Sequence, residues 1–182
     1  MIRSKSELKS ILFQEGCKYI SANLKNRIIR KFTSEISYEI FRFQSSLRRA
    51  EYHSNKNSIY HKVAYILSRR KYNRLGRRLN IEIYDGCFKP GLKIYHSSGI
   101  VVHGKAIIGS GCNLHGNNCI GNNGIDDKVP VLGDNVTLGV GAKIIGNVTI
   151  ANNTTIGANS VVIRSILEEG TIVAGAPARK IG

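Results

Sequence analysis

Residues 132–162 have the sequence LGDNVTLGVGAKIIGNVTIANNTTIGANSVV, in which an aliphatic side chain recurs at every sixth position. The same spacing extends back to Val102, with a break between Ile120 and Leu132. This period fits neither an α-helix, with about 3.6 residues per turn, nor a flat strand, whose period is about two. A period of six is typical of short strands and tight turns wound into a parallel β-solenoid.

The repeat predicts which side chains enter the solenoid core. The aliphatic residues in phase are Val102, Ile108, Leu114, Ile120, Leu132, Leu138, Ile144, Ile150, Ile156 and Val162. Small or β-branched residues follow four positions later, where the coil must turn: Ala106, Cys112, Val136, Ala142, Val148, Thr154 and Ser160. Gly, Asn and Asp at the corners tolerate positive φ. Each coil pairs with its neighbours, so a stack is stable where one repeat is not.

Three segments depart from the period. Residues 88–101, FKPGLKIYHSSGIV, lose the phase, and functional residues often lie where a regular scaffold is interrupted. Residues 122–130, NNGIDDKVP, keep the count but place Asp126 on a core position, which predicts a projecting loop. Residues 168–182 leave the repeat, and Gly175 and Pro177 favour an extended tail folded over the last coil.

The N-terminal part has helical spacing instead. We expect helices over residues 4–20, 23–50 and 59–79, with residues 51–58 as a connection. The apolar stripe of the second is Leu24, Ile28, Phe32, Ile36, Ile40, Phe43 and Leu47, and that of the third is Val63, Ile66 and Leu67. The predicted domains are a basic helical region over 1–80, the solenoid over 81–167 and the tail over 168–182.

Positive charge is concentrated in the helical region. Residues 1–80 contain 19 Lys and Arg against 5 Asp and Glu, a net charge of +14, whereas residues 81–182 carry +1 of the total of +15. One interpretation is a solvated surface; the other is contact with an anionic surface, either a membrane leaflet or a phosphate-bearing substrate. No nucleic-acid-binding motif accompanies the charge, so we do not expect a nucleic-acid partner.

Composition gives further expectations about location and metals. The four cysteines, Cys17, Cys87, Cys112 and Cys119, form no CxxC pair and no zinc-like spacing, so we expect no metal. No apolar run approaches the length of a membrane span, and the N-terminus lacks a secretory apolar block. We therefore predict a cytoplasmic protein, with peripheral association at the inner face of the membrane as a further hypothesis.

Three segments together resemble a known family. Residues 132–162 are similar to the hexapeptide-repeat acyltransferases, which form a left-handed parallel β-helix. The segments IYHSSGIVVHGKAIIG (94–109) and VAGAPARKIG (173–182) resemble the serine acetyltransferases. The resemblance covers about residues 81–182. It implies an acetyl-CoA-dependent O-acetyltransferase that needs no metal and assembles as a homotrimer or as a dimer of trimers.

Transfer of an acetyl group to a hydroxyl needs a general base, and histidine suits this role near neutral pH. His96 lies in the irregular segment and matches the catalytic histidine of the family, so we expect it to be the base. His103 is close enough in sequence to line the same cleft, although a surface or packing role is the alternative for it and for His115. We expect His53 and His61 at the surface.

Two positions differ from the serine acetyltransferases. An Asp that orients the catalytic histidine in that family is replaced by Tyr95, which leaves Asp85 or Glu82 as the carboxylate that orients His96. An Arg-His-Pro segment that helps to hold serine is replaced by residues 128–130, Lys-Val-Pro. The resemblance places Asp127 and Lys128 near the acceptor.

These differences favour a different acceptor. The pattern of residues 93–109 and the loop ending DKVPVLGDN (127–135) look more like the branch associated with sugar O-acetylation. We therefore expect a sugar hydroxyl in capsule or O-antigen polysaccharide as the acceptor. L-serine, as in cysteine biosynthesis, is the first alternative, and a non-catalytic assembly module is the second.

The resemblance also implies an acetyl-CoA groove between adjacent solenoids. Gly139, Gly141 and Ala142 leave room for the pantetheine arm, although turn geometry and core packing explain them equally well. Basic side chains make charge-assisted hydrogen bonds with phosphate, and the candidates for the CoA phosphates are Lys143, Arg179 and Lys180.

Overall fold

The computed structural model describes residues 2–20 and 23–181. The chain divides into two compact units, Met1–Asn80 and Ile81–Gly182. Residues 1, 21, 22 and 182 of the predicted domain ranges lie outside the described residues, as does the side chain of Leu24 in the predicted apolar stripe.

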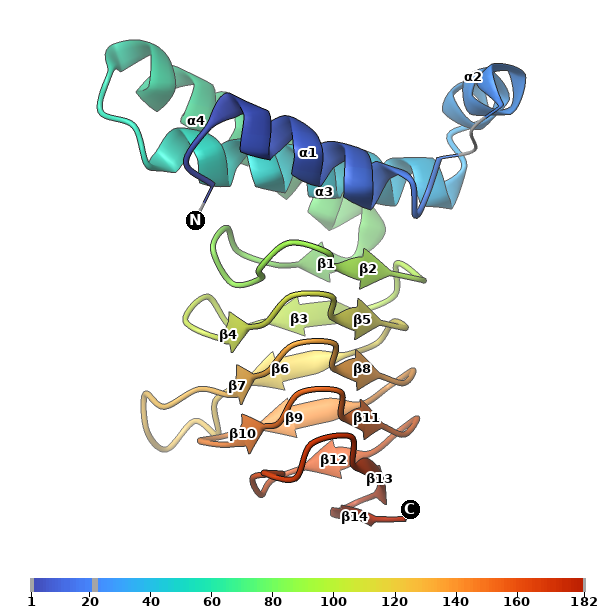
Figure 1. Ribbon diagram of the computed structural model, residues 1–182, viewed down its shortest axis with the longest axis vertical. Helices are drawn as coiled ribbons and strands as arrows, with labels where there is room; N and C mark the ends of the chain where they lie inside the picture. Colours follow the sequence, from blue (N-terminus) through green and yellow to red (C-terminus); the bar gives the residue numbers. More distant parts are fainter. Residues whose placement is uncertain (1, 21–22, 182) are drawn as a thin grey trace. The chain divides into compact units, whose positions relative to one another are not determined.

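The second unit is a left-handed parallel β-helix, as the sequence predicts, and its coils stack regularly in Figure 1. Sheet A contains β1 (Ile81–Glu82), β3 (Ile100–Val102), β6 (Cys119–Gly121), β9 (Lys143–Ile145) and β12 (Val161–Val162). Sheet B contains β4 (Ile107–Ile108), β7 (Val131–Leu132) and β10 (Thr149–Ile150). Sheet C contains β2 (Lys93–Ile94), β5 (Asn113–Leu114), β8 (Thr137–Leu138), β11 (Thr155–Ile156), β13 (Ile172–Gly175) and β14 (Ala178–Lys180).

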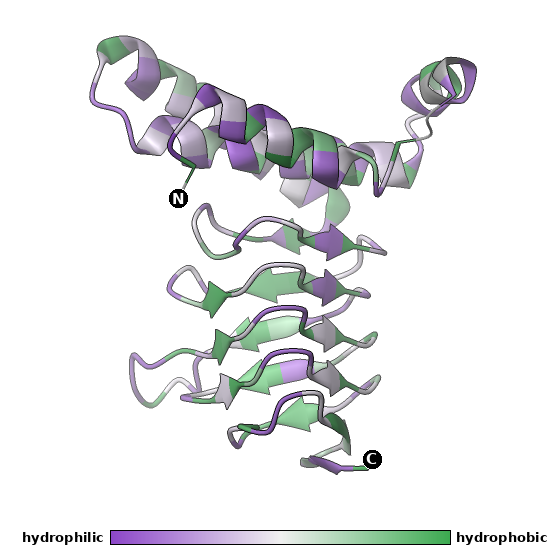
Figure 2. Cartoon of the chain, viewed as in Figure 1, coloured by the Kyte–Doolittle hydropathy of each residue, from purple (hydrophilic) through white to green (hydrophobic). Residues whose placement is uncertain are grey.

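The hexad residues form the core of this prism. All ten predicted aliphatic side chains are at most 2% exposed, and the seven small corner residues are buried as well. The parallel register stacks Leu114 against Leu138, and Leu138 against Ile156, so each inward side chain packs on its counterpart in the next coil. Figure 2 shows hydrophobic residues along β3, β6 and β12.

The predicted loop is present between β6 and β7 (Figure 1). Ile120 pairs with Ile144, 24 positions later, whereas Ile144 pairs with Val162, 18 positions later, so this coil holds one extra hexad. Asp126 is exposed rather than in the core, and the loop is closed by Asn123 Oδ1, which accepts from the backbone N–H groups of Ile125 and Asp126.

The C-terminal segment forms a hairpin at the end of sheet C. Strand β13 continues the parallel sheet against β11, and β14 pairs with β13 in antiparallel fashion. The peptide bond between Ala176 and Pro177 is cis. The hairpin brings Arg179 beside Ala174, so the basic end of the chain lies against the last coil.

The described residues of the first unit, 2–20 and 23–80, form four helices rather than the three that were predicted. They are α1 (Lys5–Gly16), α2 (Leu24–Phe32), α3 (Ile36–Ser54) and α4 (Ile59–Leu79). The expected helix over 23–50 breaks because Ser34 has a φ of 52°, which an α-helix cannot accommodate. Helix α3 instead continues to Ser54, so the predicted connection 51–58 shortens to four residues.

The helices pack through only part of their predicted apolar stripes. Ile40, Phe43 and Leu47 of α3 are buried, and the Phe43 ring meets Tyr72 of α4 edge-on at 6.2 Å between centroids. Ile28, Phe32 and Ile36 are exposed, and so is the whole predicted apolar face of α4: Val63, Ile66 and Leu67. That face therefore packs on no described residue closely enough to be buried.

Buried charge holds α1 against α3. The Arg48 guanidinium donates to Glu15 of α1 at 2.8 Å and to Glu51 of its own helix at 2.9 Å, and all three side chains are nearly inaccessible. Burial disfavours the charged guanidinium, but attraction to Glu51 and Glu15 outweighs this effect and raises the pKa of Arg48. Removing one member would leave the others uncompensated.

Two histidines predicted at the surface instead contact each other between α3 and α4. The Nδ1 atoms of His53 and His61 are 2.8 Å apart, and both residues are half-buried. Burial lowers the pKa of His53, and charge on His61 and Arg49 lowers it further.

Among the described residues, no helix is long and apolar enough to cross a membrane.

Candidate active site

The turns that lead from sheet C to sheet A form a continuous edge of the prism, here called the C–A edge. It comprises residues 95–99, 115–118, 139–142 and 157–160 of successive coils. Backbone hydrogen bonds connect these turns: the N–H of Asn117 donates to Ser98, that of Gly141 to Gly116 at 2.9 Å, and that of Asn159 to Val140 at 2.8 Å.

His96 lies in the first turn of the C–A edge. Ile94 is fully buried and the Tyr95 N–H donates to the Leu114 carbonyl at 2.8 Å, so the chain leaves the regular coil directly before His96. The residue is exposed, and no described residue hydrogen-bonds to its ring. The imidazole is therefore accessible to a substrate.

Gly116 allows the His96 turn to lie close to the next coil. Its φ is +109°, and a Cβ there would lie 2.6 Å from Ser98 Oγ and 3.2 Å from both the Cβ and the carbonyl oxygen of His96. Any other residue would be strained and would displace the turn. Sequence analysis did not single out Gly116, because its need for glycine comes from a neighbour twenty residues earlier.

Asn118 fixes the same corner from inside. Its side chain is fully buried, its Oδ1 accepts from the Gly116 N–H at 2.9 Å, and its Nδ2 donates to the Gly139 carbonyl at 2.8 Å. These bonds satisfy a buried amide and link two successive turns. A polar residue in a hexad corner position was the available indication, and it was missed.

Tyr95 and His115 form a stacked pair beside His96. Their rings are 4.3 Å apart with an interplanar angle of 12°, and Lys93 Nζ lies 5.4 Å from the centre of the Tyr95 ring. Tyr95 is 46% exposed, so part of its side chain remains accessible to solvent. The position at which the resemblance expects an orienting carboxylate thus holds a flat aromatic surface.

Three of the predicted acetyl-CoA residues, Gly139, Gly141 and Ala142, share the C–A edge with His96. Gly139 and Gly141 lie two coils away, roughly 10 Å at the usual spacing of paired strands. A Cβ on Gly139 would lie 2.7 Å from the Ala158 N, so close stacking alone requires glycine there. Ala142 is fully buried and offers only its backbone, while Lys143 Nζ donates to the Gly141 carbonyl at 3.0 Å.

Four other predicted residues lie on a different edge, here called the A–B edge, where turns lead from sheet A to sheet B. It holds Asp85, His103 and the loop with Asp127 and Lys128. His103 Nδ1 accepts from the Lys105 N–H at 3.2 Å, and Lys105 Nζ lies 3.9 Å from Asp127 Oδ2. Within one chain, strand β3 separates this edge from His96.

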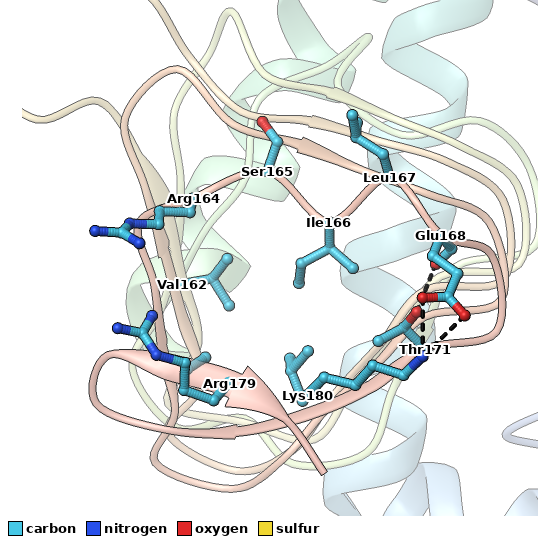
Figure 3. Close-up of a pocket in the computed structure, with 11 residues that line it drawn as sticks. Val162, Arg164, Ser165, Ile166, Leu167, Glu168, Thr171, Arg179 and Lys180 are labelled. Carbon is cyan, nitrogen blue, oxygen red and sulfur yellow. Dashed lines mark hydrogen bonds and ion pairs between the residues drawn. The ribbon is translucent and has the colours of Figure 1, made fainter. Parts of the chain in front are cut away.

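A pocket of about 280 Å³ lies at the C-terminal end of the β-helix (Figure 3). Arg164 and Arg179 extend along one side of it, whereas Lys180 points to Glu168 and contacts both carboxylate oxygens at 2.8 Å. Lys180 is thus already paired within the chain. Arg164, which sequence analysis did not select, supplies a second guanidinium beside Arg179.

The thiol of Cys119, which lies directly after the C–A edge, has a pKa that burial changes. Cys119 lies opposite Lys143 in sheet A; burial raises the pKa of its thiol, and the positive charge of Lys143 opposes that change.

Among the described residues, no group of three or more His, Cys, Asp or Glu side chains is placed to hold a metal ion.

The comparisons with known proteins agree with this architecture. Residues 130–164 match the family model described as bacterial transferase hexapeptide (six repeats). The chain is 34% identical over 132 residues to a serine acetyltransferase of Synechococcus elongatus. The alignment covers 66% of this chain and 54% of that relative. A serine acetyltransferase of Staphylococcus xylosus is 33% identical over 125 residues, with coverages of 66% and 57%.

Residues 130–164 thus match the hexapeptide repeats of bacterial transferases, and the chain resembles the serine acetyltransferases. The resemblance predicted from residues 81–182 is therefore confirmed. The chain spans somewhat more than half the length of these serine acetyltransferases.

Solved serine acetyltransferases share the fold. The enzyme from Brucella abortus strain S19 superposes with a TM-score of 0.74 at 24% identity, covering 97% of this chain and 69% of its own. Soybean serine acetyltransferase in complex with serine gives a TM-score of 0.74 at 23% identity, with coverages of 96% and 69%.

Proposed function

We propose that this chain transfers the acetyl group of acetyl-CoA to a hydroxyl group, with L-serine as the leading acceptor. The observation that carries the proposal is the exposed His96, held in an irregular turn of a β-helix that resembles serine acetyltransferases. The sequence alone favours a sugar acceptor. The relatives at 33–34% identity are serine acetyltransferases, so they support L-serine better.

In the proposed reaction His96 is the general base. Its imidazole takes the hydroxyl proton as the oxygen attacks the thioester carbonyl carbon, which forms a tetrahedral intermediate. The intermediate collapses with cleavage of the C–S bond, and the imidazolium returns the proton to the CoA thiolate. The products are the acetyl ester and free CoA, and an exposed imidazole is what such a proton shuttle requires.

We further propose that the site is completed by a neighbouring subunit of a trimer. The C–A edge holds His96 and the candidate acetyl-CoA residues, while Asp127 and Lys128 lie on the A–B edge of the same chain. If three such prisms pack side by side around a threefold axis, the C–A edge of one subunit would lie opposite the A–B edge of the next. Such packing explains why the candidate residues separate in a single chain.

Acetyl-CoA would follow the C–A edge in this arrangement. The absence of side chains at Gly139 and Gly141 exposes backbone groups to the pantetheine arm. Arg179 and Arg164 at the end of the prism are better placed than Lys180 to bind phosphate, because Lys180 is paired with Glu168. Paired guanidinium groups suit phosphate recognition.

A second candidate acceptor is the sugar hydroxyl that the sequence favours. The ring of Tyr95, which is 46% exposed and stacks on His115, is an aromatic face directly before His96 in the chain. Such a face can pack against the apolar side of a sugar ring. The panel of acceptors tested for acetylation therefore includes sugars.

Release of CoA from acetyl-CoA should be measured with L-serine and with a panel of free and nucleotide-linked sugars. We expect saturable turnover with L-serine and loss of that turnover in His96→Ala. Turnover with a sugar but not with L-serine would replace the leading acceptor with the second. A purified, folded trimer that acetylates neither class would contradict the proposed activity.

A further inference from the structure

Helix α4 carries a continuous surface that the proposed acetyl transfer does not use. Residues three or four positions apart lie on one face of a helix. On this face Ile59, Tyr60, Val63, Ile66 and Leu67 are 51–82% exposed, although side chains of this size normally gain by burial. The next positions along the same face are Arg70, Arg74 and Arg77. We call this set of eight residues the α4 face.

The basic end of the α4 face is not neutralised. Helix α4 contains seven Lys and Arg residues and no Asp or Glu. Among the residues that the structure describes, none forms an ion pair with Arg70, Arg74 or Arg77. Burial lowers the pKa of the adjacent Lys71, and repulsion from Arg49, Arg42 and Arg74 adds to the effect.

The two ends of the face meet at a hollow of about 360 Å³. Tyr65 and Ile66 line its apolar side, and Arg69, Arg70 and Arg77 line its basic side. The Arg69 guanidinium donates to the Tyr65 hydroxyl at 3.1 Å, which holds one arginine at the boundary. A concave site with guanidinium groups beside aliphatic side chains matches a phosphate attached to an apolar body.

We propose that the α4 face docks the protein on an anionic phospholipid bilayer, with the arginines on lipid phosphates and the aliphatic side chains at the acyl boundary. A basic amphipathic helix with a low overall hydropathy binds a bilayer in this way, parallel to its surface. The net charge of +14 on residues 1–80 complements an anionic leaflet and opposes pairing of two such faces from separate copies. Membrane docking does not depend on the proposed acetyl transfer.

The test is co-sedimentation of the full chain with vesicles of phosphatidylcholine alone and with about one quarter phosphatidylglycerol, at low and high salt. We expect binding to the anionic vesicles only, and weaker binding at high salt. The double variant Arg70→Gln, Arg77→Gln should lower the partition coefficient by at least about tenfold. The apolar double variant Ile66→Ser, Leu67→Ser should also lower it.

The matched control is Lys5→Gln, Lys9→Gln, which removes two exposed charges from α1 and should retain most of the binding. Circular dichroism of each variant would establish that it is folded. The proposal is overturned if the wild-type chain ignores anionic vesicles, or if the arginine variant binds as well as the wild type. It is also overturned if Ile66→Ser, Leu67→Ser reduces the oligomer mass in solution without changing vesicle binding.

Discussion

The two units of this chain differ in how completely they bury their own apolar residues. In the β-helix every hexad aliphatic is enclosed, and the unit is nearly neutral. In the helical unit, whole stripes of aliphatic side chains remain exposed among basic residues. In the β-helix each hexad aliphatic packs on its counterpart in an adjacent coil, 18 or 24 residues away, whereas an amphipathic helix needs a partner surface from elsewhere.

The difference also appears in the polar interior. The β-helix buries neutral polar groups such as Asn118, whose amide bonds to backbone atoms of its own turn and of the next coil. The helical unit buries charged groups, among them Arg48, Glu15 and Glu51, which satisfy one another. The first arrangement follows from regular stacking, and the second specifies a single way for α1 to dock on α3.

The largest effect is expected at the C–A edge of the β-helix. His96→Ala should lower turnover by about two to four orders of magnitude, because the general base is lost. Turnover and thermal stability should be compared with His53→Asn, which changes a histidine of the helical unit and should retain activity. Full activity in His96→Ala would remove this edge as the catalytic site.

The next largest effect is expected in the helical unit. Arg48→Met should destabilise it by about 3–5 kcal/mol, because two buried carboxylates lose their partner. Urea unfolding followed by circular dichroism measures the loss, with the exposed Arg49→Met as the control. Replacing all three members by apolar residues of similar size should restore much of the stability. If Arg48→Met costs no more than Arg49→Met, the buried network does not hold α1 in place.

A smaller effect is expected from a substitution beside the His96 turn of the β-helix. It separates backbone strain, which lowers stability, from a shift of His96, which lowers turnover. Gly116→Ala should destabilise the protein by about 1–3 kcal/mol. It should also lower turnover by at least about tenfold, because the new Cβ meets Ser98 and shifts the His96 turn. Gly124→Ala is the matched control: its φ is also positive, but its Cβ would meet no atom within 4 Å. Equal turnover in the two variants would show that the corner does not position His96.

The smallest effect is expected from pH on the helical unit. His53 has a lowered pKa in the folded chain because of burial and nearby positive charge, so the folded state binds its proton less readily than the unfolded state. Its contribution to stability is present above its ordinary pKa of 6.5 and is lost as the pH falls through the lowered value. The change should be under about 1 kcal/mol, because the pair is partly solvated. Denaturation at several pH values should show a weaker dependence in His53→Asn, and an unchanged dependence would exclude the His53–His61 contact as its source.

Much of the fold could be predicted from the sequence, though unevenly. The hexad pattern identified ten inward aliphatic residues of the β-helix and the loop at residues 122–130, but not Leu92, Ile94 and Ile100, which are also fully buried. The helix pattern placed α1 and α4 but missed the break at Ser34, because a single residue with positive φ leaves no mark on apolar periodicity. It also identified Val63, Ile66 and Leu67 as the apolar face of α4, and the structure leaves that face exposed.

The candidate site was predictable in part. His96 was identified by its irregular segment and by its resemblance to a family motif. Its supports, Gly116 and Asn118, lie twenty or more residues away and act through contacts between coils, which local sequence does not contain. The pairing of Lys180 with Glu168, and the place of Arg164 beside Arg179, likewise depend on the C-terminal hairpin.

By itself, the sequence determined the coil, its core and the concentration of positive charge, because each of these follows from spacing and composition along the chain. Only the tertiary structure decided which turns share an edge, which charges are paired and which apolar faces remain open. Those properties depend on distances between residues that stacking and helix packing bring together, and the order of residues along the chain does not specify them.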